Sequence, residues 1–131
     1  MPPAIPIATY RLQLTGDFDF DAAAQVAPYL KALGISHVYA SPFMKARKGS
    51  SHGYDVVDHT KFNPELGGEE GFARFSDALK RNDLGLILDF VPNHVGVHFA
   101  DNPWWLDVLE WGPQSPHAVS FDIDWDQLPY R

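Results

Sequence analysis

Strand-like and helix-like segments alternate along this chain, and this alternation limits the possible folds more than any other property of the sequence. Strand patterns occupy the centre of residues 5–14 and residues 35–40, and amphipathic helix patterns occupy residues 19–33 and 69–82. The third strand pattern, residues 85–91 (GLILDFV), is almost entirely apolar, as is typical of a parallel strand buried on both faces. The order predicts an α/β fold, either a parallel sheet or a (β/α)8 barrel.

Turn and capping residues predict where the first helix begins and ends. Residues 15–17 (TGD) predict a turn before it, and Asp19 is the expected N-cap. Pro28 lies inside the helix pattern and has no backbone N–H, so we expect a kink or two shorter helices there. Gly34 is the expected C′ residue that ends the helix.

The length of the chain limits how much of a barrel it can form. A TIM (β/α)8 barrel takes about 200 residues or more, so this chain of 131 residues is expected to supply about three strands. We expect residues 1–95 to be the N-terminal part of such a barrel and residues 96–131 to begin an inserted subdomain. Residues 42–67 are expected to form a long loop, and residues 103–110 a short helix with Asn102 as N-cap.

Composition excludes several classes of partner. The net charge of −7, with no basic run, argues against a nucleic-acid partner. The chain has no cysteine, so disulfides and thiolate metal sites are excluded. No secretory signal pattern and no apolar run of membrane-spanning length is present, so we expect a soluble, cytoplasmic protein without a membrane partner.

The polar residues at the end of the third strand pattern are the first candidate site. Asp89 falls within the apolar run, and Asn93 and His94 follow within five residues. A carboxylate in such a strand is costly unless it is hydrogen-bonded, and catalytic and binding groups of barrels collect at the carboxyl ends of the strands. The alternative is that Asp89 caps the following loop and His94 is an ordinary loop residue.

A second polar cluster follows the second strand pattern and is expected on the same rim. It contains His52, Gly53, Tyr54 and Asp55. A tyrosine ring can stack on a sugar, a carboxylate can accept hydrogen bonds from hydroxyls, and glycine permits close backbone approach. Gly-Tyr-Asp is also ordinary turn composition. The second cluster therefore supports a functional site mainly because it is expected on the same rim as the first.

Other chemistries fit these residues less well. Asp89, Asn93, His94, His98 and Asp101 offer oxygen and nitrogen ligands, but their spacing matches no strong metal motif. A contribution of Asn93 and Asp101 to a Ca²⁺ site has no further support. No nucleophile elbow and no phosphate-binding glycine loop is present. We therefore predict no metal and no cofactor.

The two polar clusters resemble motifs of the α-amylase family of glycoside hydrolases and transglycosylases. Residues 89–94 (DFVPNH) are similar to the family's strand-three signature, and residues 53–55 (GYD) to the element after strand two. A finer resemblance is to the maltooligosyl trehalose synthase subfamily. It is carried by residues 8–13, 37–42, 49–56, 63–68, 102–105, 107–110 and 121–125.

The resemblance implies an intramolecular transglycosylation by a retaining mechanism with two carboxylates. The reducing-end α-1,4 linkage of a maltooligosaccharide or α-1,4-glucan becomes an α,α-1,1 linkage. Tyr54 would stack on the sugar, Asp55 would hold neighbouring groups, and His94 would hydrogen-bond a hydroxyl, while Asp89 and Asn93 would support the site. The candidate substrate-binding residues are Tyr54, Asp55, His94 and His52.

The catalytic carboxylates of the family follow later strands, so we expect the nucleophile and the acid/base beyond Arg131 and an inactive fragment. Asp122, Asp124 and Asp126 lie in the expected insertion and do not replace them. Two alternatives stay open. One is a fragment of an α-amylase-like glucan hydrolase, and the other is a non-catalytic carbohydrate-binding module that uses Tyr54, Trp104 and Trp105.

Overall fold

The computed structural model describes residues 5–98 and 100–127. Its contacts divide the chain into two compact units, Met1–Gly96 and Val97–Arg131. Within the described ranges, no helix is both long and apolar enough to cross a membrane. The first unit contains both polar clusters.

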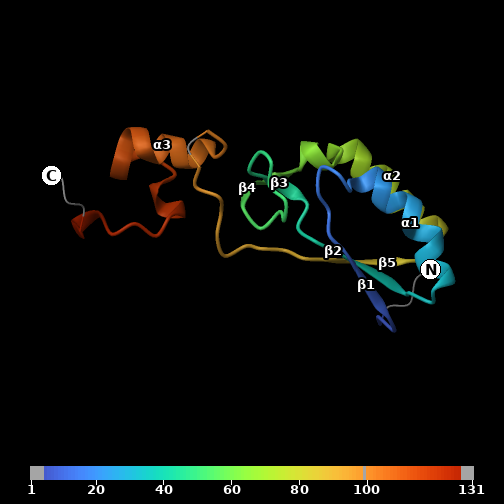
Figure 1. The fold of residues 1–131 in the computed structure, drawn as a ribbon. Coiled ribbons are helices and arrows are strands. Elements are labelled where there is room, and N and C mark those ends of the chain that lie inside the picture. Colours follow the sequence, from blue (N-terminus) through green and yellow to red (C-terminus); the bar gives the residue numbers. More distant parts are fainter. Residues whose placement is uncertain (1–4, 99, 128–131) are drawn as a thin grey trace. The chain divides into compact units, whose positions relative to one another are not determined.

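The first unit is built on a three-stranded parallel sheet (Figure 1). The strands are β1 (Thr9–Leu12), β2 (His37–Ala40) and β5 (Gly85–Leu88), in the order β1-β2-β5. Leu12 pairs with Ala40, and Ala40 pairs with Leu88, so the carboxyl ends of the three strands meet at one edge. The predicted α/β fold with parallel strands is confirmed.

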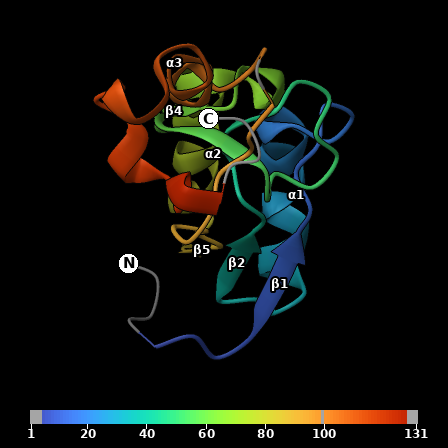
Figure 2. The same cartoon turned by 90° about the vertical axis from the view of Figure 1, so that its left-hand side faces the viewer.

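Helices α1 (Phe20–Ala32) and α2 (Gly68–Arg81) lie side by side against this sheet, as both ribbon views show (Figures 1 and 2). Asp19 caps α1 as predicted, accepting from the N–H of Ala22 at 2.9 Å, and Gly34 has a φ of +92°. The expected division of the helix at Pro28 is wrong, because α1 runs through this residue without a break. Pro28 is exposed, so its ring does not interrupt the buried face.

Phenylalanine side chains fill the core between the sheet, the helices and the segment after β2. Phe20 and Phe75 are fully buried and stack with ring centres 5.9 Å apart. Phe43 and Phe62 contact Phe20 edge to face, and Phe72 stacks on Phe62 at 4.5 Å. These five aromatic rings therefore stabilise the core.

The segment expected to be a long loop contains a second, two-stranded antiparallel sheet. Its strands are β3 (Met44–Ala46) and β4 (Val56–Phe62). Val56 and Val57 are buried, so this segment packs against the rest of the first unit and pairs its backbone polar groups in strands. The prediction of one long loop over residues 42–67 is wrong for that reason.

The third predicted strand is shorter than its apolar run. β5 ends at Leu88, and Leu88 is 53% exposed, so burial on both faces is not observed. In the sheet order of the described residues β5 is an edge strand, which leaves one side of it without a neighbour. Asp89 accordingly follows the strand instead of lying inside it.

The second unit contains one α-helix within its described residues, α3 (Pro103–Trp111). Its predicted N-cap is confirmed, since the Oδ1 atom of Asn102 accepts from the N–H groups of Trp104 and Trp105 at 3.1 Å each. Trp105 packs on Phe121 with ring centres 5.1 Å apart. Short 3₁₀ helices complete the two units: η1 (Pro64–Leu66), η2 (Gly112–Gln114), η3 (Ala118–Ser120) and η4 (Trp125–Gln127).

Candidate functional site

The candidate site is centred on Asp89, at the point where β5 ends. Its Oδ2 atom accepts three hydrogen bonds: from Tyr54 Oη at 2.5 Å, Tyr39 Oη at 3.1 Å and Arg11 Nη1 at 3.1 Å. The side chain of Asp89 is only 15% exposed. Burial of a carboxylate is costly without partners, and here two hydroxyls and a guanidinium offset the cost.

The same contacts determine the protonation of the cluster. Partial burial alone would raise the pKa of Asp89, but the hydrogen bonds from Tyr54, Arg11 and Tyr39 outweigh it, and the pKa lies below its ordinary value. The hydrogen bond to Asp89 is the main reason why the pKa of Tyr54 is raised. At neutral pH the site therefore holds an ionised carboxylate and a neutral phenol.

The loop of residues 50–55 carries Tyr54 to this cluster. Gly53 has a φ of +77°, and a Cβ atom at this position would lie 2.3 Å from the carbonyl oxygen of Pro42. The Oγ atom of Ser50 accepts from the N–H of Gly53 at 3.0 Å and donates to Asp55 at 2.5 Å. Asp55 thus holds the loop together, and only glycine permits the close approach at residue 53.

Two histidines contact the backbone of Tyr54. The Nε2 atom of His94 lies 2.9 Å from the carbonyl oxygen of Tyr54, which can only accept, so Nε2 carries the proton. His94 Nδ1 then accepts from the amide of Asn93 at 3.2 Å. His52 Nδ1 accepts from the N–H of Tyr54 at 3.0 Å, which assigns its proton to Nε2. Both ring nitrogens of His94 thus have protein partners.

The structure brings the two predicted polar clusters together through Tyr54, which contacts both Asp89 and His94. Three residues of the network were not among the predicted site residues: Arg11, Gln13 and Tyr39. The sequence contained a signal for two of them, since Arg11 and Gln13 are polar residues two apart in the strand pattern of residues 5–14 and are expected on the same side of it. Nothing local in the sequence indicated which side faces Asp89.

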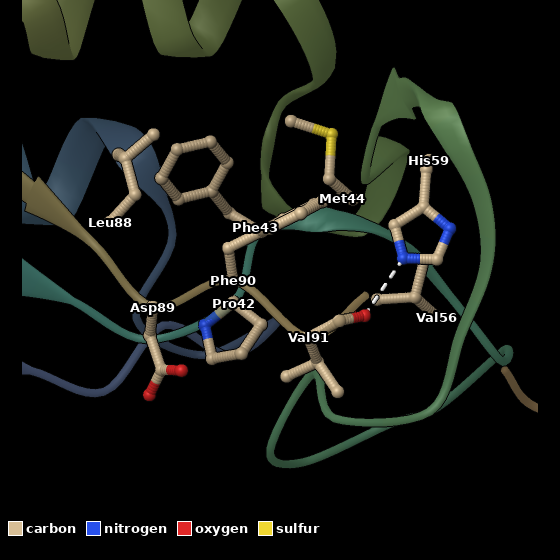
Figure 3. Close-up of a pocket in the computed structure, with 9 residues that line it drawn as sticks. All are labelled: Pro42, Phe43, Met44, Val56, His59, Leu88, Asp89, Phe90 and Val91. Carbon is tan, nitrogen blue, oxygen red and sulfur yellow. Dashed lines mark hydrogen bonds between the residues drawn. The ribbon is translucent and has the colours of Figure 1, made fainter. Parts of the chain in front are cut away.

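A shallow open pocket lies beside the polar network (Figure 3). It is lined mainly by apolar side chains, among them Phe43, Leu88 and Phe90, and the carboxylate of Asp89 points away from Phe43 and Leu88. His59 closes one side and contacts the carbonyl oxygen of Val91 at 3.0 Å. Recognition of a sugar needs converging polar groups, so the polar network is the better candidate site.

Metal binding has no structural support in the described part of the chain. No group of three or more His, Cys, Asp or Glu side chains there is arranged to hold a metal ion. Asp89, the best-placed carboxylate, is already bonded to three protein donors.

Acidification is expected to weaken the network. Because the pKa of Asp89 is lowered in the folded chain, its contribution to stability is present above the unfolded value of about 3.9 and is lost as the pH falls through the folded value. Thermal melting of the chain from about pH 7 down to about pH 1 measures this loss. We expect Asp89→Asn, which has no titrating carboxyl, to melt lower at neutral pH and to lose part of the pH dependence. Parallel curves for the two proteins contradict the assignment.

Comparisons with known proteins identify the family and the fold of this chain. The profile of the α-amylase catalytic domain matches residues 13–110. A solved maltooligosyltrehalose synthase from Arthrobacter ramosus is 48% identical and has a TM-score of 0.90, over 92% of this chain and 16% of that one. A curated Mycobacterium tuberculosis protein that bears the name of the same enzyme is 49% identical over 126 residues.

The similarity extends to other enzymes at lower identity. A maltogenic α-amylase of Bacillus acidopullulyticus is 35% identical over 80% of this chain and 17% of its own length. The chain spans about 16% of the length of the synthases that it matches. Because the catalytic-domain profile covers most of the chain, and because the residues of both family motifs converge at the carboxyl end of a parallel sheet, the chain belongs to the α-amylase family.

Proposed function

We propose that this chain is the N-terminal segment of a maltooligosyl trehalose synthase. The enzyme would convert the reducing-end α-1,4 linkage of a maltooligosaccharide or α-1,4-glucan into an α,α-1,1 linkage by intramolecular transglycosylation. Similarity to such synthases at 48–49% identity over 92% of the chain carries the proposal. A cytoplasmic location and the absence of nucleic-acid and membrane partners remain predictions.

In this proposal residues 1–95 form the first β/α units of the barrel, and residues 96–131 begin the subdomain inserted after its third strand. The parallel order of β1, β2 and β5 and the boundary between the units at Gly96 and Val97 support this division. The α3 helix then belongs to the inserted subdomain.

The network positions the sugar and does not cleave it. Tyr54 presents its ring to the sugar of the reacting linkage, and its hydroxyl is held by Asp89 and Arg11. Asp89 has a lowered pKa and three donors, so it is unsuited to be a general acid at neutral pH. The nucleophile and the acid/base of the retaining mechanism are therefore assigned to the part of the enzyme outside this segment.

The histidines complete the proposed sugar contacts. His52 is exposed and carries its proton on Nε2, which makes that nitrogen a donor to a sugar hydroxyl. His94 already uses both ring nitrogens, and the longer contact is the one from Asn93, at 3.2 Å. A sugar hydroxyl that donates to Nδ1 therefore replaces the amide of Asn93.

A segment exchange tests the function directly. In a chimera, this 131-residue chain replaces the matching segment of the Arthrobacter ramosus synthase. We expect the chimera to consume the reducing ends of maltopentaose without an equal release of glucose, because isomerisation releases no sugar. The isolated chain is expected to change neither quantity, since this proposal assigns the nucleophile and the acid/base to the part of the enzyme outside the segment.

Each alternative predicts a different result. Release of glucose or maltose that exceeds the loss of reducing ends identifies a hydrolytic segment, the α-amylase-like alternative. Loss of reducing ends with the isolated chain shows that its own carboxylates are catalytic. Binding of maltopentaose by the isolated chain, with an inactive chimera, favours the carbohydrate-binding module.

A further inference from the structure

Two polar side chains, one in β1 and one directly after it, face the loop that carries Tyr54. Arg11 lies in β1 (Thr9–Leu12), and Gln13 follows the end of that strand. Arg11 Nη2 donates to Gln13 Oε1 at 3.3 Å, and Gln13 Nε2 donates to the carbonyl oxygen of His52, also at 3.3 Å. The two side chains therefore tie β1 to the backbone of residues 50–55.

The guanidinium group of Arg11 contacts three more segments of the unit. It donates to Asp89 after β5 at 3.1 Å and to the hydroxyl of Tyr54 at 2.8 Å. Its central carbon lies 4.8 Å from the ring centre of Tyr39 on β2, within the range of a cation–π contact. A planar fork of donors is needed to reach both oxygens at once, and the ammonium group of lysine lacks this geometry.

These contacts fix the ring of Tyr54 from both ends. At the outer end the hydroxyl accepts from Arg11 and donates to Asp89. At the backbone end the N–H donates to His52, and the carbonyl accepts from His94. A ring held at both ends has its position set before a ligand arrives, which is the preorganisation that tight and fast sugar recognition requires.

We propose that Arg11, supported by Gln13, is a positioning residue that sets the orientation of the Tyr54 ring for the sugar. This inference rests on the proposed function of the site and extends it to Arg11 in β1 and to Gln13, which directly follows that strand. Arg11 does not touch the sugar. It acts through Tyr54 and through Asp89, whose charge it balances.

A second arginine of the same unit provides a matched control. Arg74 on α2 forms a two-pronged ion pair with Asp21 on α1, with contacts of 2.7 and 2.9 Å. Its side chain is 54% exposed, against 35% for Arg11, and this ion pair joins two helices away from the loop of residues 50–55. Arg74→Lys thus measures the loss of a forked ion pair away from the site.

The test compares Arg11→Lys, Arg74→Lys and Arg11→Ala in the chimera with maltopentaose as substrate. We expect Arg11→Lys to lower kcat/KM by about 10- to 100-fold, the range of a misplaced positioning group, while Arg74→Lys stays within about threefold of the parent. Melting midpoints of the two lysine variants are expected to agree. Low concentrations of free guanidinium are expected to restore part of the activity of Arg11→Ala, because the ion can occupy the vacated position.

The outcomes distinguish a failure of the proposed role of Arg11 from a failure of the proposed function of the chain. An active parent chimera with a fully active Arg11→Lys variant overturns the role of Arg11 alone. The positioning role of Arg11 is also overturned if Arg11→Lys loses activity together with a lower melting midpoint and free guanidinium restores no activity to Arg11→Ala. In that case Arg11 has only a structural role. An inactive parent chimera overturns the proposed function and this inference with it.

Discussion

Tyr54→Ala is expected to lower kcat/KM of the chimera for maltopentaose by about 30-fold or more. The substitution removes the ring proposed to stack on the sugar, a contact worth about 0.5–1.5 kcal/mol. It also removes the 2.5 Å hydrogen bond to the Asp89 carboxylate, and hydrogen bonds to charged groups contribute about 1.5–3 kcal/mol. Together about 2–4 kcal/mol corresponds to a loss of roughly 30- to 1000-fold.

Two variants determine which part of Tyr54 is responsible. Tyr54→Phe keeps the ring and removes the hydroxyl, so it is expected to lose less activity than Tyr54→Ala. Tyr29 on α1 is 62% exposed and has no contact with the network in the described residues, so Tyr29→Ala is the control and should retain full activity. If Tyr54→Ala keeps kcat/KM within about threefold of the parent, Tyr54 is not part of the sugar site.

The second large effect is expected from Gly53→Ala. A Cβ atom here would lie 2.3 Å from the carbonyl oxygen of Pro42, and the φ of +77° adds backbone strain. The obstructing atom belongs to the backbone just after β2, so no change of rotamer relieves the clash, and the loop must move. Moving it displaces Tyr54 from Asp89, so we expect at least a 10-fold loss of kcat/KM, because misplaced groups cost about that much or more.

Gly49→Ala separates the effect of the clash with Pro42 from the effect of backbone strain. Gly49 has a nearly identical φ of +75°, but a Cβ atom added there would meet no other atom within 4 Å. The variant therefore suffers only the strain of the left-handed conformation, about 1–3 kcal/mol, and should keep most of its activity. Melting midpoints and kcat/KM of both variants are measured in the chimera. Equal behaviour of the two variants shows that the approach to Pro42 does not position the loop.

Several helix ends in both units could be predicted from short patterns. The N-cap at Asp19, the glycine at position 34 and the N-cap at Asn102 are where the sequence placed them. These signals are local, because a cap or a helix end depends on hydrogen bonds within a few residues. The expectation at Pro28 failed since the sequence does not show that the residue would lie on the exposed side of α1.

Other features depended on contacts between distant parts of the chain. The segment after β2 became β3 and β4 because Val56 and Val57 found buried positions in the first unit. Leu88 stayed half exposed because β5 is an edge strand in the described sheet. Neither outcome can be read from a window of neighbouring residues, since burial is decided by which segments pack together.

The candidate site shows the same division. Local motifs identified Asp89, His94 and Tyr54 and predicted that they follow the carboxyl ends of parallel strands. This was possible because strand patterns, and their order along the chain, can be recognised from short stretches of sequence. Only the tertiary structure joined Arg11 to Asp89, 78 residues along the chain. That contact arises from the pairing of β1 with β2 and of β2 with β5, and the register of strands is set by packing of the whole sheet.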